Sequence, residues 1–347
     1  VNASCRGVMC WGKPVWLDRL PVPAINFSNS FGPLEGMGNF LNDDRAIGKM
    51  AAHHLLSRGY ADYVVVSFGA KQFSIERTAG FLEALREAGV EGREIPLPAY
   101  VPPEDRTIWT PLMYLESMAE ALQALLADLH PVTGIFCVDS AVVQQVEHAL
   151  STRLGELVQT VGLLSGDRSI TGRWIPGERQ ITSTVCPASH RQGLEAMQAL
   201  LTAEERGTRV NRMLKRFPPR GVAVRASTAG PACGHPPTAR AIRWSWQQVQ
   251  AGQPPSVEEL AAHLEISART LNRQFTRETQ MTVRDFLLGL RMERAANSLA
   301  QNLDWSIERI ATEAGFTKQG AFSAAFKQRT GQSPRDYRKA FAISDGT

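Results

Sequence analysis

The chain has 347 residues, of which 43% are hydrophobic and 21% charged, which is ordinary for globular domains. This length accommodates two or three domains with cores of their own. No run of eighteen apolar residues occurs, so we expect no membrane-spanning helix. The five cysteines, an odd number at irregular spacing, argue against a disulfide framework and favour a reducing compartment.

Positive charge is confined to the last third of the chain. Residues 1–239 hold 23 Lys and Arg against 23 Asp and Glu, whereas residues 240–347 hold 15 against 11. A neutral region followed by a basic one suggests that only the second meets a polyanion.

The first twenty residues have neither an initiator Met nor the basic-then-apolar layout of a signal peptide. They read as the interior of a domain, so we expect the chain to be a fragment or the product of a mis-started open reading frame. From about 42 to 217, short apolar strands alternate with amphipathic helices. The strands are expected at 63–69, 134–140, 160–166 and 180–186, and the helices at 45–59, 77–89, 115–129 and 191–205. Such alternation predicts an α/β domain with parallel sheets, which bind ligands at the carboxyl ends of their strands.

A Pro-, Gly- and Ala-rich segment follows one further short strand at 221–225. We expect an α/β domain at 1–225, a linker at 226–237 and a second domain at 238–347. Every apolar segment of this last part has helical spacing, so the second domain is predicted to be all-α.

The second domain contains an internal repeat. Residues 257–267 match 307–317 at a shift of 50, and residues 271–275 match 322–326 at a shift of 51. Each copy predicts a helix, a tight turn and a second helix, followed by another helix. Four capping signals support these helices: the Ser256–Glu259 capping box, Ser267 and Thr317 before the second helices, and Ser333 before Pro334.

The second helix of each copy has two different faces. Apolar residues four apart form a stripe, Leu271 with Phe275 and Phe322 with Phe326. The opposite faces carry Arg269, Asn272 and Arg273 in one copy, and Lys318, Gln319 and Ser323 in the other. Helices joined by such a turn place the second helix in the DNA major groove, where Arg reads guanine and Asn or Gln reads adenine. A helical bundle with solvated faces is the alternative, and two matching copies on the only basic domain make it less favoured.

Residues 238–341 resemble the AraC/XylS family of transcription regulators. The resemblance rests on "SVEELAAHLEISARTLNRQFTRET" and "IERIATEAGFTKQGAFSAAFKQRTGQSPRDYRK". It implies two helix-turn-helix units in which Arg269, Asn272, Arg273, Gln319 and Ser323 face bases. The chain departs from the family at four positions: Glu265 and Gln280 replace glycines, and Gly320 and Ala324 replace longer polar residues. The second unit is therefore expected to contact mainly phosphates.

Residues 6–225 resemble the LacI/GalR effector domain, which has the periplasmic-binding-protein-like fold of two lobes. The resemblance implies that the first strand and helix of that fold are missing here. The stretches that carry this resemblance are "NDDRAIGKMAAHHLLSRGY", "SIERTAGFLEALREAGV", "GIFCVDSAVVQQVEHAL" and "QITSTVCPASHRQGLEAMQALL". Joined to an AraC-type domain, it is the arrangement of xylose-responsive activators. The resemblance implies that Arg77 and Asp139 bind a sugar-like effector, although Asp139 also suits a helix N-cap. Leu164 stands where a second acidic ligand is usual, so we expect weak affinity for xylose, with Asp167 as the candidate substitute.

These patterns predict a DNA-binding transcription regulator in the cytoplasm, an activator rather than an enzyme, with no cofactor and no metal. The expected partners are promoter DNA, a small carbohydrate, RNA polymerase and a second copy of the chain, and no membrane. Two alternatives are open. The first is a regulator that has lost its effector response. The second is an amidotransferase-like domain with Cys137 as nucleophile, although no His stands at a recognisable partner site.

Overall fold

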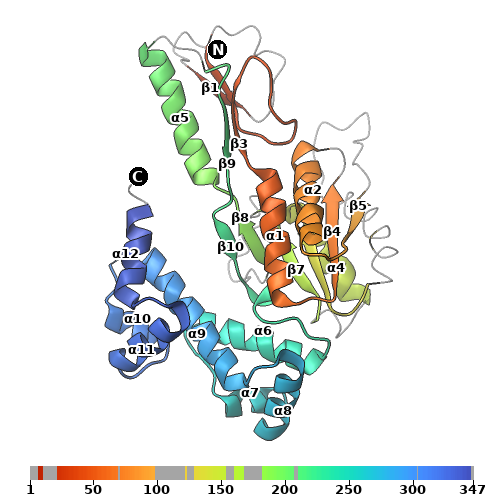
Figure 1. Cartoon of the computed structure of the whole chain (residues 1–347), viewed down its shortest axis with the longest axis vertical. Helices are drawn as coiled ribbons and strands as arrows, with labels where there is room; N and C mark the ends of the chain where they lie inside the picture. The colour runs from red at the N-terminus through yellow and green to blue at the C-terminus, as the bar shows by residue number, and fades with distance from the viewer. Residues whose placement is uncertain are drawn as a thin grey trace. The chain divides into compact units, whose positions relative to one another are not determined.

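The computed structural model describes residues 7–10, 22–68, 71–97, 122, 129–153, 160–167, 182–206, 210–302 and 304–344 (Figure 1). The chain divides into two compact units, Val1–Thr228 and Ala229–Thr347. The division lies within the segment 226–237 expected as a linker. There the short 3-10 helix η3 (Ala226–Thr228) ends the first unit, and helix α6 begins at Pro236. The predicted helix at 115–129 lies mostly outside the described residues.

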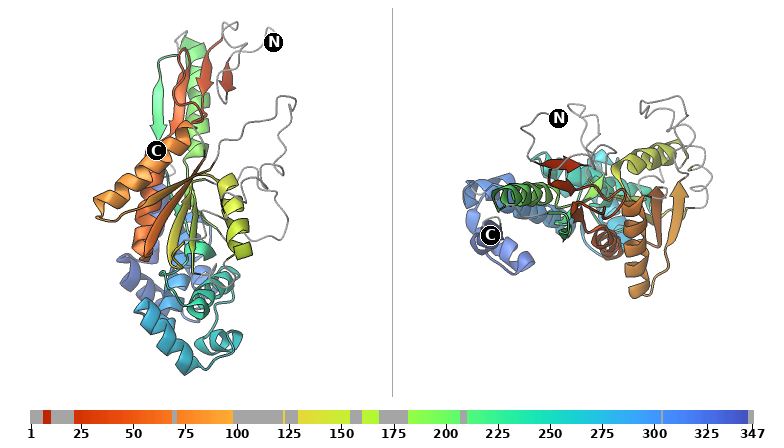
Figure 2. Two further views of the ribbon diagram at one scale, coloured as in Figure 1. Left: turned by 90° about the vertical axis from the view of Figure 1, so that its right-hand side faces the viewer. Right: turned by 90° about the horizontal axis from the view of Figure 1, so that it is seen from above.

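A six-stranded sheet forms the larger lobe of the first unit. Its strand order is β10 (Gly221–Ala223), β8 (Ser183–Cys186), β7 (Gly162–Ser165), β6 (Thr133–Cys137), β4 (Asp62–Phe68) and β5 (Arg93–Leu97). All neighbours pair in parallel except β10, which is antiparallel to β8. Helices α1 (Asp44–Arg58) and α2 (Gln72–Glu87) cover one face, and α4 (Ser140–Arg153) covers the other (Figure 2). Covered faces explain why Val64, Val65 and Val66 are all buried.

The second lobe is a parallel four-stranded sheet that sequence reasoning did not find. Its order is β1 (Val8–Cys10), β2 (Ala24–Asn26), β3 (Gly38–Asn42) and β9 (Leu214–Phe217). Helix α5 (Ser189–Arg206) packs its Ala196 and Leu200 against Ile25, Phe40 and Phe217 (Figure 1). Two sheets in one unit confirm the predicted two-lobed α/β fold.

Helices α1 and α2 pack at backbone contact. A Cβ at Gly48 would lie 2.0 Å from the carbonyl oxygen of Arg77, and one at Gly80 would lie 2.1 Å from that of Arg45. Only glycine permits this approach. The crossing places Arg77 of α2 beside Asp44, the first residue of α1.

The second unit contains only helices among its described residues, as predicted. They are α6 (Pro236–Gln250), α7 (Val257–His263), α8 (Ala268–Thr279), α9 (Val283–Gln301), α10 (Ile307–Glu313), α11 (Gln319–Thr330) and α12 (Pro334–Ser344). Two apolar clusters form its core, one around Leu271 and Phe275 and the other around Phe322 and Phe326. The predicted stripes of both second helices are therefore buried.

Hydrogen bonds at the helix starts reproduce the repeat. Ser256 and Glu259 form the predicted capping box, with Glu259 N donating to Ser256 Oγ at 3.1 Å. Its counterpart Ser306, fifty residues on, accepts from Arg309 N at 3.0 Å. Ser267 accepts from Thr270 N at 3.1 Å, and Ser333 accepts from Asp336 N at 3.2 Å. These capping predictions are confirmed.

The predicted cap at Thr317 is wrong. Helix α11 starts one residue later, with Lys318 as N-cap and no capping side chain. The extra residue in this turn is what changes the repeat shift from 50 to 51. A lysine side chain carries no acceptor, so the first amides of α11 have no side-chain cap.

The repeat also includes the helices that precede each copy. Buried positions of α6 correspond to buried positions of α9 at a shift of 50: Ile242 with Met292, Ser245 with Ala295, and Val249 with Leu299. Each copy is therefore a three-helix unit, α6–α8 and α9–α11. Only burial is shared between α6 and α9, so a comparison of residue types did not reveal it.

Candidate functional site

Helix α8 presents a polar face opposite its buried stripe. Leu271 and Phe275 are 1% and 0% exposed, whereas Arg269 and Arg273 are exposed. Asn272 is half-buried, and its Nδ2 donates to the carbonyl of Ala268 at 3.1 Å. Two guanidinium groups on one exposed helical face suit the major-groove edges of guanine.

Helix α11 presents a shorter polar face. Gln319 is exposed at its first position, Ser323 is half-buried, and Lys318 is exposed immediately before it. Gly320 and Ala324 are also exposed, and a Cβ added at Gly320 would meet no atom within 4 Å. This face has fewer groups that reach a base edge than the face of α8.

Matched contacts hold both second helices in place. The hydroxyl groups of Thr279 and Thr330 donate to the carbonyls of Phe275 and Phe326, at 2.7 and 2.8 Å. The same phenylalanines pack on the rings of the following helices, Phe275 on Phe286 at 5.2 Å and Phe326 on Tyr337 at 5.3 Å between centroids. The two helices are thus presented by equivalent scaffolds.

Further cations are exposed around α11 and at the start of α9. They are Arg284, Lys327, Arg329, Arg335 and Lys339. Exposed cations of this kind attract a phosphate backbone without reading its sequence.

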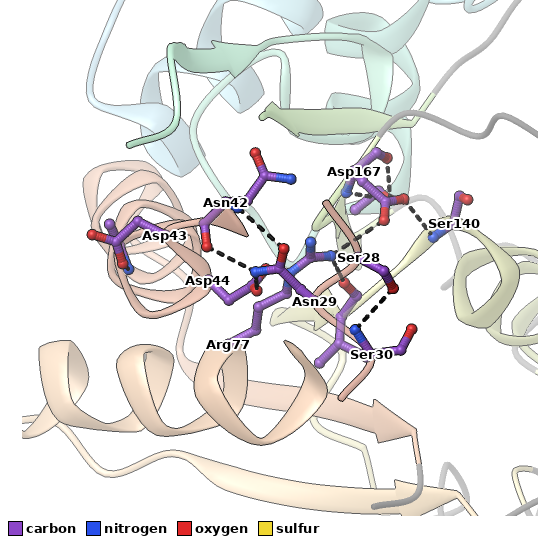
Figure 3. Close-up of polar contacts among 12 residues, drawn as sticks. Ser28, Asn29, Ser30, Asn42, Asp43, Asp44, Arg77, Ser140 and Asp167 are labelled. Atoms are coloured by element: carbon purple, nitrogen blue, oxygen red, sulfur yellow. Dashed lines mark hydrogen bonds and ion pairs between the residues drawn. The ribbon is translucent and has the colours of Figure 1, made fainter. Parts of the chain in front are cut away.

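Arg77 forms the centre of a polar cluster in the first unit (Figure 3). Its Nε donates to Asp44 Oδ1 at 2.7 Å, and its Nη1 donates to the carbonyl of Val138 at 2.6 Å and to Asp167 Oδ2 at 3.2 Å. Only 4% of Arg77 is exposed. Desolvation acts to lower the pKa of Arg77, but Asp44 and Asp167 outweigh it, so the pKa is raised and the side chain stays charged.

The cluster lies at the carboxyl ends of parallel strands. Asp44 follows β3, Val138 follows β6 and Asp167 follows β7, which is where open α/β sheets bind ligands. Asn29, after β2, donates its Nδ2 to Asp44 Oδ2 and, at 2.8 Å, to the carbonyl of Asn42 (Figure 3). Burial raises the pKa of Asp44, and contacts with Arg77 and Asn29 oppose that rise.

Sequence reasoning missed Asp44 and Asn29. Both follow strands of the four-stranded sheet, which was not predicted. The signal available was the Asn42-Asp43-Asp44 run before a clear amphipathic helix, of which Asp43 caps α1 by accepting from Ala46 N at 3.0 Å.

The predicted acidic residues have distinct surroundings. Asp167 Oδ1 accepts from Ser140 N at 3.1 Å, so Asp167 joins Arg77 to the start of α4. Asp139 Oδ1 accepts from Val142 N at 2.9 Å, the contact expected of an N-cap. Leu164 is fully buried within β7 and takes no place in the cluster. The structure brings Arg77 and Asp167 together and gives Asp139 a capping contact.

Cys137 lacks the properties of a nucleophile. It is fully buried at the end of β6, and burial, with Glu147 and Asp139 nearby, raises the pKa of its thiol well above the usual value. A catalytic thiol needs a lowered pKa and access to substrate. The amidotransferase alternative is therefore not favoured.

Neither a metal centre nor a membrane span is found in the described part of the chain. No group of three or more His, Cys, Asp or Glu among those residues can hold a metal ion. His54 contacts Thr228 Oγ1 at 2.7 Å. Within the same ranges, no helix has the length and apolarity needed to cross a bilayer.

Family comparisons agree with both units. The model of the periplasmic binding protein-like domain matches residues 52–228, about half of the chain. The chain belongs to the periplasmic binding protein-like family. A helix-turn-helix domain model matches residues 260–340, so the second unit carries the AraC-type domain expected from its motifs.

Curated relatives match the second unit. The Msm operon regulatory protein of Streptococcus mutans serotype c is 34% identical over 90 residues, which are 26% of this chain and 32% of that protein. The transcriptional activator RhaS of Klebsiella pneumoniae is 34% identical over 95 residues, 27% of this chain and 34% of its own. The chain thus spans about a third of the length of these relatives.

One solved structure is similar over both units. The xylose-binding transcription activator xylR aligns over 93% of this chain and 83% of its own, with a TM-score of 0.59 and 19% identity. At this identity the likeness shows that the fold is shared.

Proposed function

We propose that the protein is a sequence-specific DNA-binding transcription regulator, and not an enzyme. The observation that carries the proposal is the pair of helix-turn-helix units in residues 229–347, each exposing a polar second helix. The buried stripes of α8 and α11, and the equivalent caps Ser256 and Ser306 of α7 and α10, are not required of a plain helical bundle. The regulator RhaS is named an activator, which favours activation and a contact with RNA polymerase.

The two helix-turn-helix units contribute differently to DNA binding. In α8, Arg269, Asn272 and Arg273 read base edges, while in α11 Gln319 and Ser323 provide at most a few base contacts. Lys318 and the exposed cations near α11 bind phosphates. The first helix-turn-helix unit therefore sets the DNA sequence preference, and the second helix-turn-helix unit adds salt-dependent affinity for DNA.

The effector is a small carbohydrate bound at the Arg77 cluster. Support comes from its place at the carboxyl ends of the strands and from the paired Arg77 and Asp167, with Asp139 adjacent. Carboxylate and guanidinium groups suit the hydroxyls of a sugar. A regulator of this kind acts on promoter DNA in the cytoplasm, and a homodimer would place two DNA-binding domains on one promoter.

A regulator without effector response is the second candidate. It is favoured by the state of Arg77, whose Nε and Nη1 already bond protein atoms. A sugar must displace or join those contacts, and each buried group left unpaired costs about 1–3 kcal/mol.

DNA selection tests the main proposal. The full chain is used to capture fragments of genomic DNA, and we expect one enriched sequence whose affinity falls steeply with salt. Capture of fragments without a shared sequence would contradict specific binding.

Thermal shift with a panel of monosaccharides separates the two effector candidates. A sugar at a hundred times its Kd adds about 2.7 kcal/mol of stability to the protein that binds it. The shift should vanish in Asp167→Asn, which keeps the side-chain volume, and persist in the control Arg45→Ala, whose exposed side chain pairs with Glu83 outside the cluster. No shift with any sugar would favour the regulator without effector response.

A further inference from the structure

Helix α9 belongs to the cores of both helix-turn-helix units. Its first half contributes to the first cluster and its second half to the second: Val283, Phe286 and Leu290, then Met292, Ala295 and Leu299. Figure 1 shows α9 running between α7–α8 and α10–α12. The change of partner falls between Leu290 and Met292, at Arg291.

Two arginines of α9 hold the turn between α10 and α11. Arg291 donates from Nε to the carbonyl of Ala314 at 2.6 Å and from Nη2 to that of Gly315 at 2.7 Å. Arg294 donates from Nη1 to the carbonyl of Glu313 and from Nη2 to Glu313 Oε2, both at 2.9 Å. A helix leaves its last carbonyls unpaired and carries a partial negative charge there, so cations at this end bind well.

The contact continues into the second recognition helix. The guanidinium of Arg291 lies over the ring of Phe316, 4.4 Å from its centroid. Phe316 packs edge-on against Phe322 of α11 at 5.6 Å, and Phe322 is fully buried. Arg291 is therefore linked through one aromatic ring to the helix that faces DNA.

The equivalent positions of the first helix-turn-helix unit carry different residues. The residues fifty positions before Arg294 and Glu313 are Trp244 and His263, whose rings stack with centroids 4.3 Å apart at 13°. Arg291 corresponds to Ala241, which is fully buried. Equivalent places thus use ring stacking in one unit and charged hydrogen bonds in the other.

The hydrogen bonds of Arg291 and Arg294 to residues 313–315, called the clamp below, also lie where the two helix-turn-helix units touch each other. A Cβ at Gly315 would be 2.9 Å from Pro254 Cγ, so the segment before α7 lies against the turn before α11. Gly252 of the same segment lies beside the guanidinium of Arg294. Segments from both helix-turn-helix units therefore lie against Arg291 and Arg294.

We propose that Arg291 and Arg294 are positioning residues that fix α11 relative to α8. The second helix-turn-helix unit then contacts DNA about one helical turn from the first helix-turn-helix unit. The inference rests on the proposed DNA binding. A guanidinium bonds two acceptors with a rigid fork, whereas a lysine ammonium is a point charge on a flexible stem. Replacing both by lysine keeps the charge and removes the fork.

Footprinting of the full chain tests this role. The double variant Arg291→Lys with Arg294→Lys is compared with wild type on the selected duplex by hydroxyl-radical cleavage. We expect the protection due to α8 to remain and the protection one turn away to be lost. The slope of log K against log salt should become shallower by about two, and Kd should rise roughly tenfold. Arg309→Lys, at an exposed arginine of α10 whose guanidinium lies over the ring of Trp305, is the control and should match wild type.

Two results would overturn the inference: a wild-type footprint in the double variant, or an equal loss of both protected regions. If wild type selects no sequence, the proposed function fails, and the clamp is then judged by amide hydrogen exchange at residues 313–316. Exchange at least tenfold faster in the double variant, at a temperature where both proteins remain folded, supports the clamp. Unchanged exchange refutes it.

Discussion

Two residues of the first helix-turn-helix unit adopt a backbone conformation that favours glycine. Glu265 and Gln280 have φ of 57° and 58°, while Gly315 and Gly331, their counterparts in the second unit, both have φ of 76°. The amides of Glu265 and Ile266 bond the carbonyls of Ala262 and Ala261 at 3.0 Å, and Gly315 forms the same kind of turn. This is the glycine-favouring end of a helix, and it supports the expectation of strain at Glu265.

Glu265→Gly should therefore stabilise the helical domain formed by residues 229–347. The left-handed conformation costs a residue with a Cβ about 1–2 kcal/mol. Glycine returns about 0.4–1 kcal/mol of this by loosening the unfolded chain, so the net gain is about 0.5–1 kcal/mol. For a domain of this size the gain raises Tm by roughly 2–5 °C. Thermal unfolding of residues 229–347, which have their own core, measures it by circular dichroism.

Two variants separate the backbone effect from others. Glu265→Ala removes the negative charge near the end of α7 but keeps a Cβ, so its Tm should gain less than that of Glu265→Gly. Gly331→Ala is the reverse change, and its Cβ would meet no atom within 4 Å, so its loss of about 1 kcal/mol reports φ alone. Equal Tm values for Glu265→Gly and Glu265→Ala would refute the reasoning.

Three further changes have defined outcomes. Arg273→Ala should cost about 1–3 kcal/mol of DNA binding and relax preference at one base pair in a binding selection, whereas equal weakening on all sequences would make Arg273 a phosphate contact. Leu164→Asp should lower the unfolding free energy by about 3 kcal/mol or more in urea titration, because Leu164 is fully buried; improved pentose binding in a stable variant would contradict this. Burial, and to a lesser extent the charge of Arg58, lowers the pKa of His54 to about 4 in the folded protein. As pH falls below 6.5, the His54 imidazole is therefore protonated in the unfolded chain before it is protonated in the folded protein. Stability should thus decline between pH 6.5 and 4, by up to about 3 kcal/mol, and His54→Gln should flatten that decline; parallel curves would exclude His54 as the cause.

Several elements of the fold could be predicted from local pattern alone. Strands β4, β6 and β7 are covered on both faces and read as continuous apolar runs. Strand β9 reads Leu-Lys-Arg-Phe with only Phe217 buried, and β2 has three residues, so neither has a recognisable pattern. Because the lobe built on the four-stranded sheet was not predicted, Asp44 and Asn29 were not found as members of the site.

The recognition helices could be placed because a duplicated motif repeats both its buried and its exposed positions. The partners of Arg291 and Arg294 could not be predicted, because three of their four hydrogen bonds go to backbone carbonyls, which no sequence pattern marks. The Thr317 cap was misplaced for a related reason. One inserted residue moved the N-cap to Lys318, which has no capping side chain.

The central claim is specific DNA binding by the second unit, and its most direct measurement is an affinity ratio. The Kd of the full chain for its selected duplex is compared with that for a shuffled duplex of equal length over a range of salt concentrations. We predict a ratio of about a thousand or more at physiological salt, reduced by Arg273→Ala. Equal affinity for both duplexes at every salt concentration would contradict the account.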